Sequence, residues 1–233
     1  MKQTRIYAVA GKDLKENISS FKALGAVGIL TNVELLLEMF GSGVSLEEMT
    51  RFLLSMDDEM TVFMSTFGSD ANEILEHAHA CTRLSDRVGM KVESSPEGFK
   101  AMRQLKEEGI KVIATTLFTY EQAYMAHAID IYAISPFVAR GNANNLNMYE
   151  MIQKTRELYD RYEYAPEILA ASIRTLDDAK NAILAGADSL AVSYSILEKM
   201  MSSSYSDAVN ASWDETIKRF KDNDINDYIA KEE

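Results

Sequence analysis

Residues 88–116, VGMKVESSPEGFKAMRQLKEEGIKVIATT, contain the repeating unit that predicts the fold. Two short apolar stretches in it, GMKVE at 89–93 and KVIATT at 111–116, predict strands. The segment between them has helical periodicity, begins with Ser95 before a proline and closes with Gly109, which are typical helix start and stop signals. A helix that joins two strands in this way predicts a parallel βαβ unit.

The same alternation continues in both directions along the chain. Six further runs predict strands: Arg5–Ala10, Val27–Thr31, Thr61–Thr66, Ile131–Ser135, Glu167–Ser172 and Ser189–Ser193. An amphipathic stretch follows each run. Eight such repeats in 233 residues favour a closed (β/α)8 TIM barrel, an α/β fold. An open doubly wound sheet is the alternative, although no G-x-G-x-x-G follows any strand.

One amphipathic segment is left over after the eighth repeat. Residues 204–220 predict an extra helix that carries the sole tryptophan, Trp213. We therefore expect a barrel over residues 1–203, with residues 204–233 forming a C-terminal helix and an acidic tail of the same domain. A surplus helix has to pack somewhere, and a neighbouring subunit is the expected place.

Charge and cysteine content exclude several classes of function. Lys and Arg number 24 against 36 Asp and Glu, so the formal charge is −12, which disfavours nucleic acid and anionic membrane partners. No stretch has the length of a membrane span or the pattern of a signal peptide. Cys81 is the single cysteine, so a disulfide within the chain is impossible and the cytoplasm is the expected location. His77, His79 and Cys81 point to diverging faces of a helix, so we expect no metal site there.

Lys91 is the first candidate for catalysis. Period-two alternation puts Gly89, Lys91 and Glu93 on one strand face, and the apolar residues between them on the face that meets the helices. Lys91 would then point into the barrel, where desolvation lowers the pKa of an ammonium group and makes it a nucleophile for a carbonyl, through a Schiff base. The alternative is a strand-end lysine that reaches solvent.

Polar residues at the ends of the other predicted strands form a second group of candidates, because active sites of barrels lie at this end. They are Thr31, Asn32, Ser65, Thr66, Thr115, Thr116, Ser135 and Ser172. Arg140 and Arg174 follow the sixth and seventh strands and would lie on adjacent repeats of one rim. With Ser172 they predict a phosphate site, and two unconnected surface arginines are the alternative.

Several segments, taken together, resemble the transaldolase family in its short form, which includes fructose-6-phosphate aldolase. The most specific are LTN at 30–32, MKV at 90–92, ATTLFTYEQAYMAHAIDIYAISPFVAR at 114–140, LAASIRT at 169–175 and LAGADSLAV at 184–192. The resemblance covers nearly the whole chain. It implies a TIM barrel that cleaves a ketose phosphate and passes a dihydroxyacetone unit to an aldose phosphate, in pentose phosphate metabolism, with neither a metal nor an organic cofactor. It also implies a homo-oligomeric ring with the C-terminal helix at the interface.

The resemblance assigns roles to individual positions. Lys91 would form the Schiff base with the ketose C2 carbonyl, and Thr115 would position a catalytic water. Asn32 would hold substrate hydroxyls, and Arg140, Ser172 and Arg174 would hold the phosphate. The remaining substrate-binding candidates are Thr31, Ser65, Ser135 and Phe137.

The sequence departs from the family pattern at the acid/base positions. Val9 stands where the first strand has an Asp, and Ser65 where the third has a Glu or Gln. Glu34 and Glu93 appear nearby instead, and we interpret Glu93 as the substitute acid/base. Phe137, where the aldolase subgroup has a Tyr, is the transaldolase-like choice. Two alternatives stay open: a lyase that releases dihydroxyacetone, and a sugar-phosphate-binding barrel with lost or altered catalysis.

Overall fold

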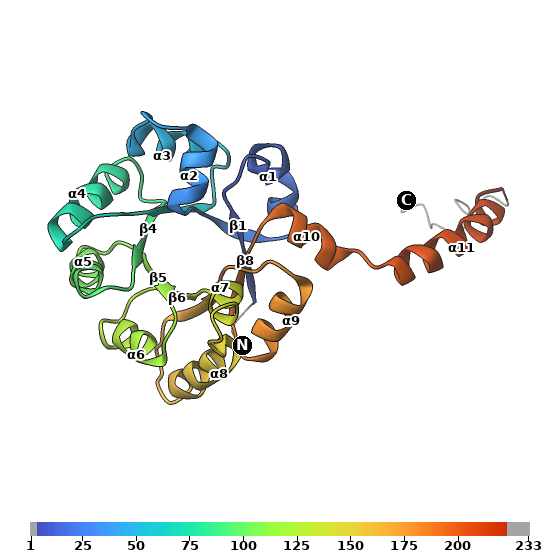
Figure 1. Ribbon diagram of the computed structural model, residues 1–233. Helices are drawn as coiled ribbons and strands as arrows, with labels where there is room; N and C mark the ends of the chain where they lie inside the picture. Colours follow the sequence, from blue (N-terminus) through green and yellow to red (C-terminus); the bar gives the residue numbers. More distant parts are fainter. Residues whose placement is uncertain (1–3, 223–233) are drawn as a thin grey trace, which may run out of the picture. The chain divides into compact units, whose positions relative to one another are not determined.

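Eight parallel strands close into a barrel in the order β1 to β8, which confirms the predicted fold (Figure 1). The computed structural model describes residues 4–222. The strands are β1 Arg5–Val9, β2 Ala26–Leu30, β3 Thr61–Ser65, β4 Val88–Glu93, β5 Val112–Leu117, β6 Ala133–Pro136, β7 Glu167–Ala170 and β8 Ser189–Val192. Direct pairing of β1 with β8 closes the barrel and rules out the open sheet.

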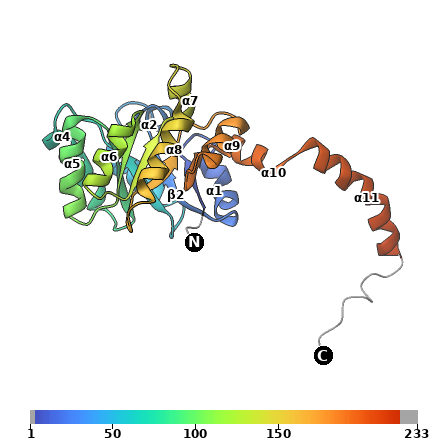
Figure 2. The same cartoon turned by 90° about the horizontal axis from the view of Figure 1, so that it is seen from below.

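Helices surround the strands in the view of Figure 1. In unit 1, defined below, they are α1 Leu14–Ala23, α2 Val33–Phe40, α3 Leu46–Leu54, α4 Ala71–Thr82, α5 Pro96–Glu107, α6 Tyr120–Ala128, α7 Val138–Asn142, α8 Met148–Tyr159 and α9 Leu176–Leu184. Two of these, α3 and the short α7, are additions to the simple repeat. Figure 2 shows α7 standing above the barrel on one side.

The expected helix signals are present in the structure. Thr119 and Thr175 form capping boxes at the starts of α6 and α9, and Ser95 caps α5 by accepting from the Gly98 N–H. Gly109 and Gly186 have φ values of 81° and 102°, the left-handed conformation in which many helices end. Local sequence thus defines where these helices begin or end.

The barrel interior is filled by side chains from alternate strand positions. Tyr7, Phe63, Ile113 and Leu169 belong to one buried interior cluster. Gly89 makes room for it, because a Cβ at this position would lie 2.5 Å from the Phe63 ring. The predicted alternation of β4 is therefore confirmed: position 89 and Lys91, two residues further on, face the interior of the barrel.

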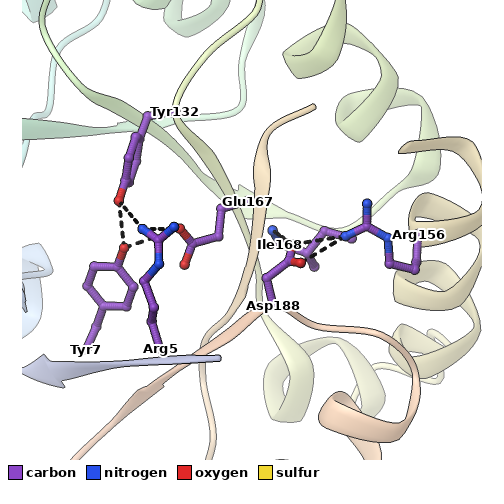
Figure 3. A network of polar contacts seen from close by, with 7 residues as sticks. All are labelled: Arg5, Tyr7, Tyr132, Arg156, Glu167, Ile168 and Asp188. Atoms are coloured by element: carbon purple, nitrogen blue, oxygen red, sulfur yellow. Dashed lines mark hydrogen bonds and ion pairs between the residues drawn. The ribbon is translucent and has the colours of Figure 1, made fainter. Parts of the chain in front are cut away.

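A polar network closes the amino ends of the strands (Figure 3). The Arg5 guanidinium donates to the Tyr132 hydroxyl at 3.0 Å and pairs with Glu167 Oε2 at 3.1 Å. The Tyr7 and Tyr132 hydroxyls are 2.9 Å apart, and burial together with this contact raises the pKa of Tyr7. This end of the barrel is thus filled by paired side chains, which is consistent with a role in stability.

A second contact in Figure 3 fastens α8 to the strands. The Arg156 guanidinium pairs with Asp188 Oδ1 at 3.0 Å, and the other Asp188 carboxylate oxygen accepts from the Ile168 N–H at 2.8 Å. Asp188 therefore links α8 to the start of β7.

The chain divides into two compact units, unit 1 at Met1–Ile196 and unit 2 at Leu197–Glu233. The predicted boundary lay at 203/204. Helix α10, Tyr194–Met201, spans the division, and α11, Ser204–Asp222, is the predicted extra helix. No helix in residues 4–222 is both long and apolar enough to cross a membrane.

Candidate active site

Two adjoining cavities lie among the carboxyl ends of the strands, with volumes of about 210 and 170 Å3. Their linings share five residues: Asn32, Glu34, Lys91, Phe137 and Arg140. These side chains come from β4 and from the segments that follow β2 and β6, which are far apart in sequence. The barrel topology is therefore what brings them together.

Lys91 lies inside the barrel, and only 5% of its surface is exposed. Its ammonium group donates to the Thr31 carbonyl oxygen at 3.1 Å and lies 5.5 Å from the centroid of the Phe137 ring. No carboxylate in the described part of the chain forms an ion pair with it. Burial lowers the pKa of Lys91 to about 8. The solvent-exposed alternative for this lysine is therefore excluded.

The lowered pKa predicts how carbonyl capture by Lys91 depends on pH. At pH 7 about one amine in ten would be neutral, against roughly one in 3,000 for a lysine of ordinary pKa. We expect adduct formation with dihydroxyacetone, measured at saturating borohydride, to accelerate up to about pH 8 and then level off. A rate that keeps rising to pH 10 would contradict the desolvated amine.

Thr31 and Ser65 form a hydrogen-bonded link between β2 and β3. The Ser65 hydroxyl donates to the Thr31 carbonyl oxygen at 3.0 Å, and the Ser65 N–H donates to the Thr31 hydroxyl at 2.8 Å. The same carbonyl also accepts from Lys91. This contact was not foreseen from the sequence, because the acceptor is a backbone atom that no residue pattern reveals. Ser65 thus helps to hold the carbonyl oxygen to which the Lys91 amine is hydrogen-bonded.

Asn32 caps α2 and lines both cavities. Its side-chain oxygen accepts from the Leu35 N–H at 2.7 Å, which fixes the orientation of the amide. The amide nitrogen can then serve as a hydrogen-bond donor toward substrate hydroxyls. One residue thus combines a structural cap with the predicted binding role.

Three buried hydroxyls near the carboxyl ends of the strands have no hydrogen-bond partner among the described residues 4–222: Thr66, Thr115 and Ser135. Thr66 and Thr115 line the smaller cavity, whereas Ser135, fully buried on β6, lines neither. The sequence places Thr66 at a strand end but predicts no particular role for it. Because a buried hydroxyl without a partner is costly, hydroxyls that line a cavity are suited to a substrate or a water molecule.

The predicted phosphate residues converge on the larger cavity, whose lining includes Arg140, Ser172 and Arg174. Two backbone hydrogen bonds, from Val138 to Ala171 and from the next residue to the Ser172 carbonyl, fasten α7 to the end of β7. Ser172 has a φ of 56°, a left-handed conformation uncommon outside glycine. The two arginines are therefore neighbours on one rim.

Phe137 lies beside both Lys91 and Arg140. The Arg140 guanidinium carbon is 5.6 Å from the ring centroid, and the Lys91 amine is 5.5 Å from it. An aromatic face stabilises each cation without neutralising it. The Phe137 ring is thus a common neighbour of the predicted nucleophile and of one predicted phosphate ligand.

The carboxylates near the site lie in different places. Glu93 lines the smaller cavity together with Lys91, as its position on the same strand face predicted. Val9, which stands at the predicted Asp position, contributes an apolar side chain to the lining of the larger cavity. Glu34 lines both cavities and pairs with Arg140 at 3.5 Å. The acidic character of the site is therefore at Glu34 and Glu93.

The His77, His79 and Cys81 side chains have separate environments. The His77 ring forms a hydrogen bond with the Phe67 carbonyl oxygen, the His79 ring contacts the Glu108 carboxylate, and Cys81 is buried. No group of three possible metal ligands occurs within the described residues 4–222.

The closed barrel, with its cavities and a desolvated lysine at the carboxyl ends of the strands, defines the protein as a (β/α)8 barrel with a candidate active site at the end where barrel enzymes have theirs. The sequence profile of the transaldolase/fructose-6-phosphate aldolase family matches residues 5–232. The chain belongs to this family.

Individual relatives agree with that assignment. A probable transaldolase from Brucella ovis is 34% identical over 177 residues, 76% of this chain and 79% of that protein. A probable transaldolase from Bartonella henselae is 29% identical over 80% of this chain and 84% of its own length. Among solved structures, thiamine phosphate pyrophosphorylase from Pyrococcus furiosus superposes with a TM-score of 0.53 at 15% identity, covering 82% of this chain and 86% of its own. That last similarity is one of fold alone.

Proposed function

We propose that the protein transfers a dihydroxyacetone unit from a ketose phosphate to an aldose phosphate through a Schiff base on Lys91. The observation that carries the proposal is a buried lysine, with a pKa lowered to about 8, in one cavity with Arg140 and Arg174. A neutral amine can attack a carbonyl, and the guanidinium groups can hold the phosphate at the other end of the same substrate.

In this mechanism the Lys91 nitrogen attacks the C2 carbonyl, and loss of water leaves a protonated imine. The C4 hydroxyl loses its proton, the C3–C4 bond breaks, and its electron pair moves into the imine to give an enamine while an aldose phosphate departs. The enamine carbon then attacks the acceptor aldehyde, the new alkoxide takes a proton, and water releases the product from Lys91. We assign the proton transfers to Glu93, with a water held by the Thr115 hydroxyl.

Borohydride trapping tests the proposal. The protein is incubated with fructose 6-phosphate or dihydroxyacetone, reduced, digested and analysed by mass for a modified Lys91. Absence of an adduct with either ketone would overturn the Schiff-base mechanism. An aldose phosphate added before reduction separates transfer, which yields a new ketose, from the lyase reaction, which releases dihydroxyacetone.

We also propose that the protein acts in the cytoplasm as a homo-oligomer joined through α11. Tyr205, Val209, Trp213 and Ile217 recur every four residues on α11 and are 85%, 48%, 56% and 44% exposed. Such a stripe of large apolar side chains is typical of a helix face that packs against a partner, here a second copy.

The sole tryptophan allows the interface to be tested directly. We expect a sedimentation coefficient well above that of the monomer, and Trp213→Glu should shift the population toward monomers because it places a charge in the apolar stripe. Ala211→Glu, which adds the same charge on the opposite helix face, is the matched control. A wild-type protein that remains monomeric at every concentration would contradict the assembly.

A further inference from the structure

Glu34 places a negative charge within the predicted phosphate site. Among the described residues, it is the one acidic residue in the lining of the larger cavity, where it accompanies Lys91, Arg140 and Arg174. Its carboxylate lies 3.5 Å from an Arg140 nitrogen, although the two residues are 106 positions apart in sequence. The contact therefore exists only because the barrel brings α2 and α7 to the same rim.

The structural explanation for Glu34 is incomplete. An acidic residue in the first turn stabilises a helix dipole, and many helices of this chain have one, including Glu73 in α4 and Glu97 in α5. Those residues line neither cavity, whereas Glu34 lines both. The ion pair itself adds little to stability, because the side chains of Glu34 and Arg140 are 79% and 45% exposed. Neither helix-dipole stabilisation nor the ion pair explains why Glu34 lies against Arg140, a predicted phosphate ligand.

A bound phosphate and the Glu34 carboxylate would compete for one guanidinium group. Arg140 carries a single positive charge and cannot neutralise two anions, and two anions near it repel one another. The carboxylate must swing away or remain as an unfavourable neighbour when a phosphate binds. An uncharged ketose end would incur no such penalty.

We propose that Glu34 is a specificity-determining residue that competes with the substrate phosphate for Arg140. Glu34 then lowers the preference of the enzyme for phosphorylated over unphosphorylated ketoses. A neutral residue at position 34 would give a stronger preference. This inference rests on the proposed function for the identity of the substrate, but the competition itself concerns an anion and Arg140.

Binding of inorganic phosphate, measured by calorimetry at low ionic strength, tests the competition without any turnover. We expect Glu34→Gln to tighten phosphate binding about three- to tenfold, since it removes one nearby opposing charge. Glu38→Gln is the matched control: Glu38 lies on the same helix, pairs with Lys12 and lines neither cavity that contains Lys91. Its effect should stay below about twofold. Equal affinities for the Glu34→Gln and Glu38→Gln variants would overturn the proposal.

A double-mutant cycle identifies the partner of Glu34. In an Arg140→Met background, the gain in phosphate affinity from Glu34→Gln should be clearly smaller than in the wild-type background, because the shared guanidinium is gone and only the direct repulsion between the two anions remains. An undiminished gain in that background would contradict competition at Arg140.

Two donors test the specificity. Glu34→Gln should raise kcat/KM for fructose 6-phosphate relative to kcat/KM for unphosphorylated fructose, and an equal proportional change for both donors would contradict the inference. Absence of a borohydride adduct on Lys91 would defeat the proposed function while the phosphate titrations still report on Glu34, so the two failures are distinguishable.

Discussion

Lys91→Met is expected to lower turnover by about 10⁴-fold or more and, at the same time, to stabilise the fold. The nucleophile is lost completely, and no other lysine within residues 4–222 lines the two cavities to replace it. Methionine has a similar length and no charge to desolvate. The Thr31 carbonyl keeps the Ser65 hydroxyl as a donor, so the substitution leaves no buried acceptor without a partner. Activity is measured with fructose 6-phosphate and an aldose phosphate.

The expected gain in stability follows from the pKa of Lys91. A fall from 10.5 to about 8 corresponds to roughly 3 kcal/mol of unfavourable free energy at pH 7. The unfolded state binds more protons than the folded state between about pH 8 and 10.5, so the penalty is complete below pH 8 and disappears as the pH rises through this range. The advantage of Lys91→Met in urea unfolding should therefore be largest at pH 7 and small near pH 10.5.

Lys199→Met provides the control, because Lys199 is exposed on α10. It should change stability by no more than about 0.5 kcal/mol and leave activity intact. An inactive Lys91→Met protein that is clearly less stable than wild type at pH 7 would show that desolvation of the buried amine does not lower the stability of the folded protein.

Gly98→Ala is expected to destabilise the protein by about 2–4 kcal/mol, although alanine favours helices. Gly98 is the third residue of α5, and a Cβ there would lie 2.0 Å from the Glu93 carbonyl oxygen, a backbone atom at the end of β4. The gain in helix propensity is only about 1 kcal/mol, so the clash outweighs it. Relief requires α5 and the end of β4 to separate, which would also displace Glu93 and lower activity.

Gly11→Ala is the matched control for that substitution. The nearest atom to a Cβ at Gly11 is a carboxylate oxygen of Asp13, 3.1 Å away, which belongs to a side chain that can move. Its effect on urea unfolding should stay within about 1 kcal/mol. A Gly98→Ala protein as stable as this control would mean that the close approach of α5 to β4 has no energetic importance.

The secondary structure could be predicted well because its signals are local. Each predicted strand agrees with the structure to within two residues at either end. Caps such as Thr175 and glycine stops such as Gly186 act over one helical turn. The short helix α7 was not predicted. Backbone hydrogen bonds to Ala171 and Ser172 at the end of β7 hold it in place, and such long-range contacts leave no pattern in the local sequence.

The candidate site could be predicted only in part. The alternation of residues along the strand was enough to predict that Lys91 points into the barrel. The order of the repeats was enough to predict that Arg140 and Arg174 lie on one rim. The roles of these residues and of Glu93 remain predictions.

Sequence alone determined the eight-fold βα repeat, the direction in which Lys91 points and the identity of the charged groups near it, because alternation and helix caps are properties of neighbouring residues. Tertiary structure decided which groups meet: the Thr31 carbonyl at the Lys91 amine, Phe137 beside Lys91 and Arg140, and Glu34 against Arg140. Closure of the barrel is the physical reason, since it brings loops from distant repeats to one rim and removes water from the lysine at its centre.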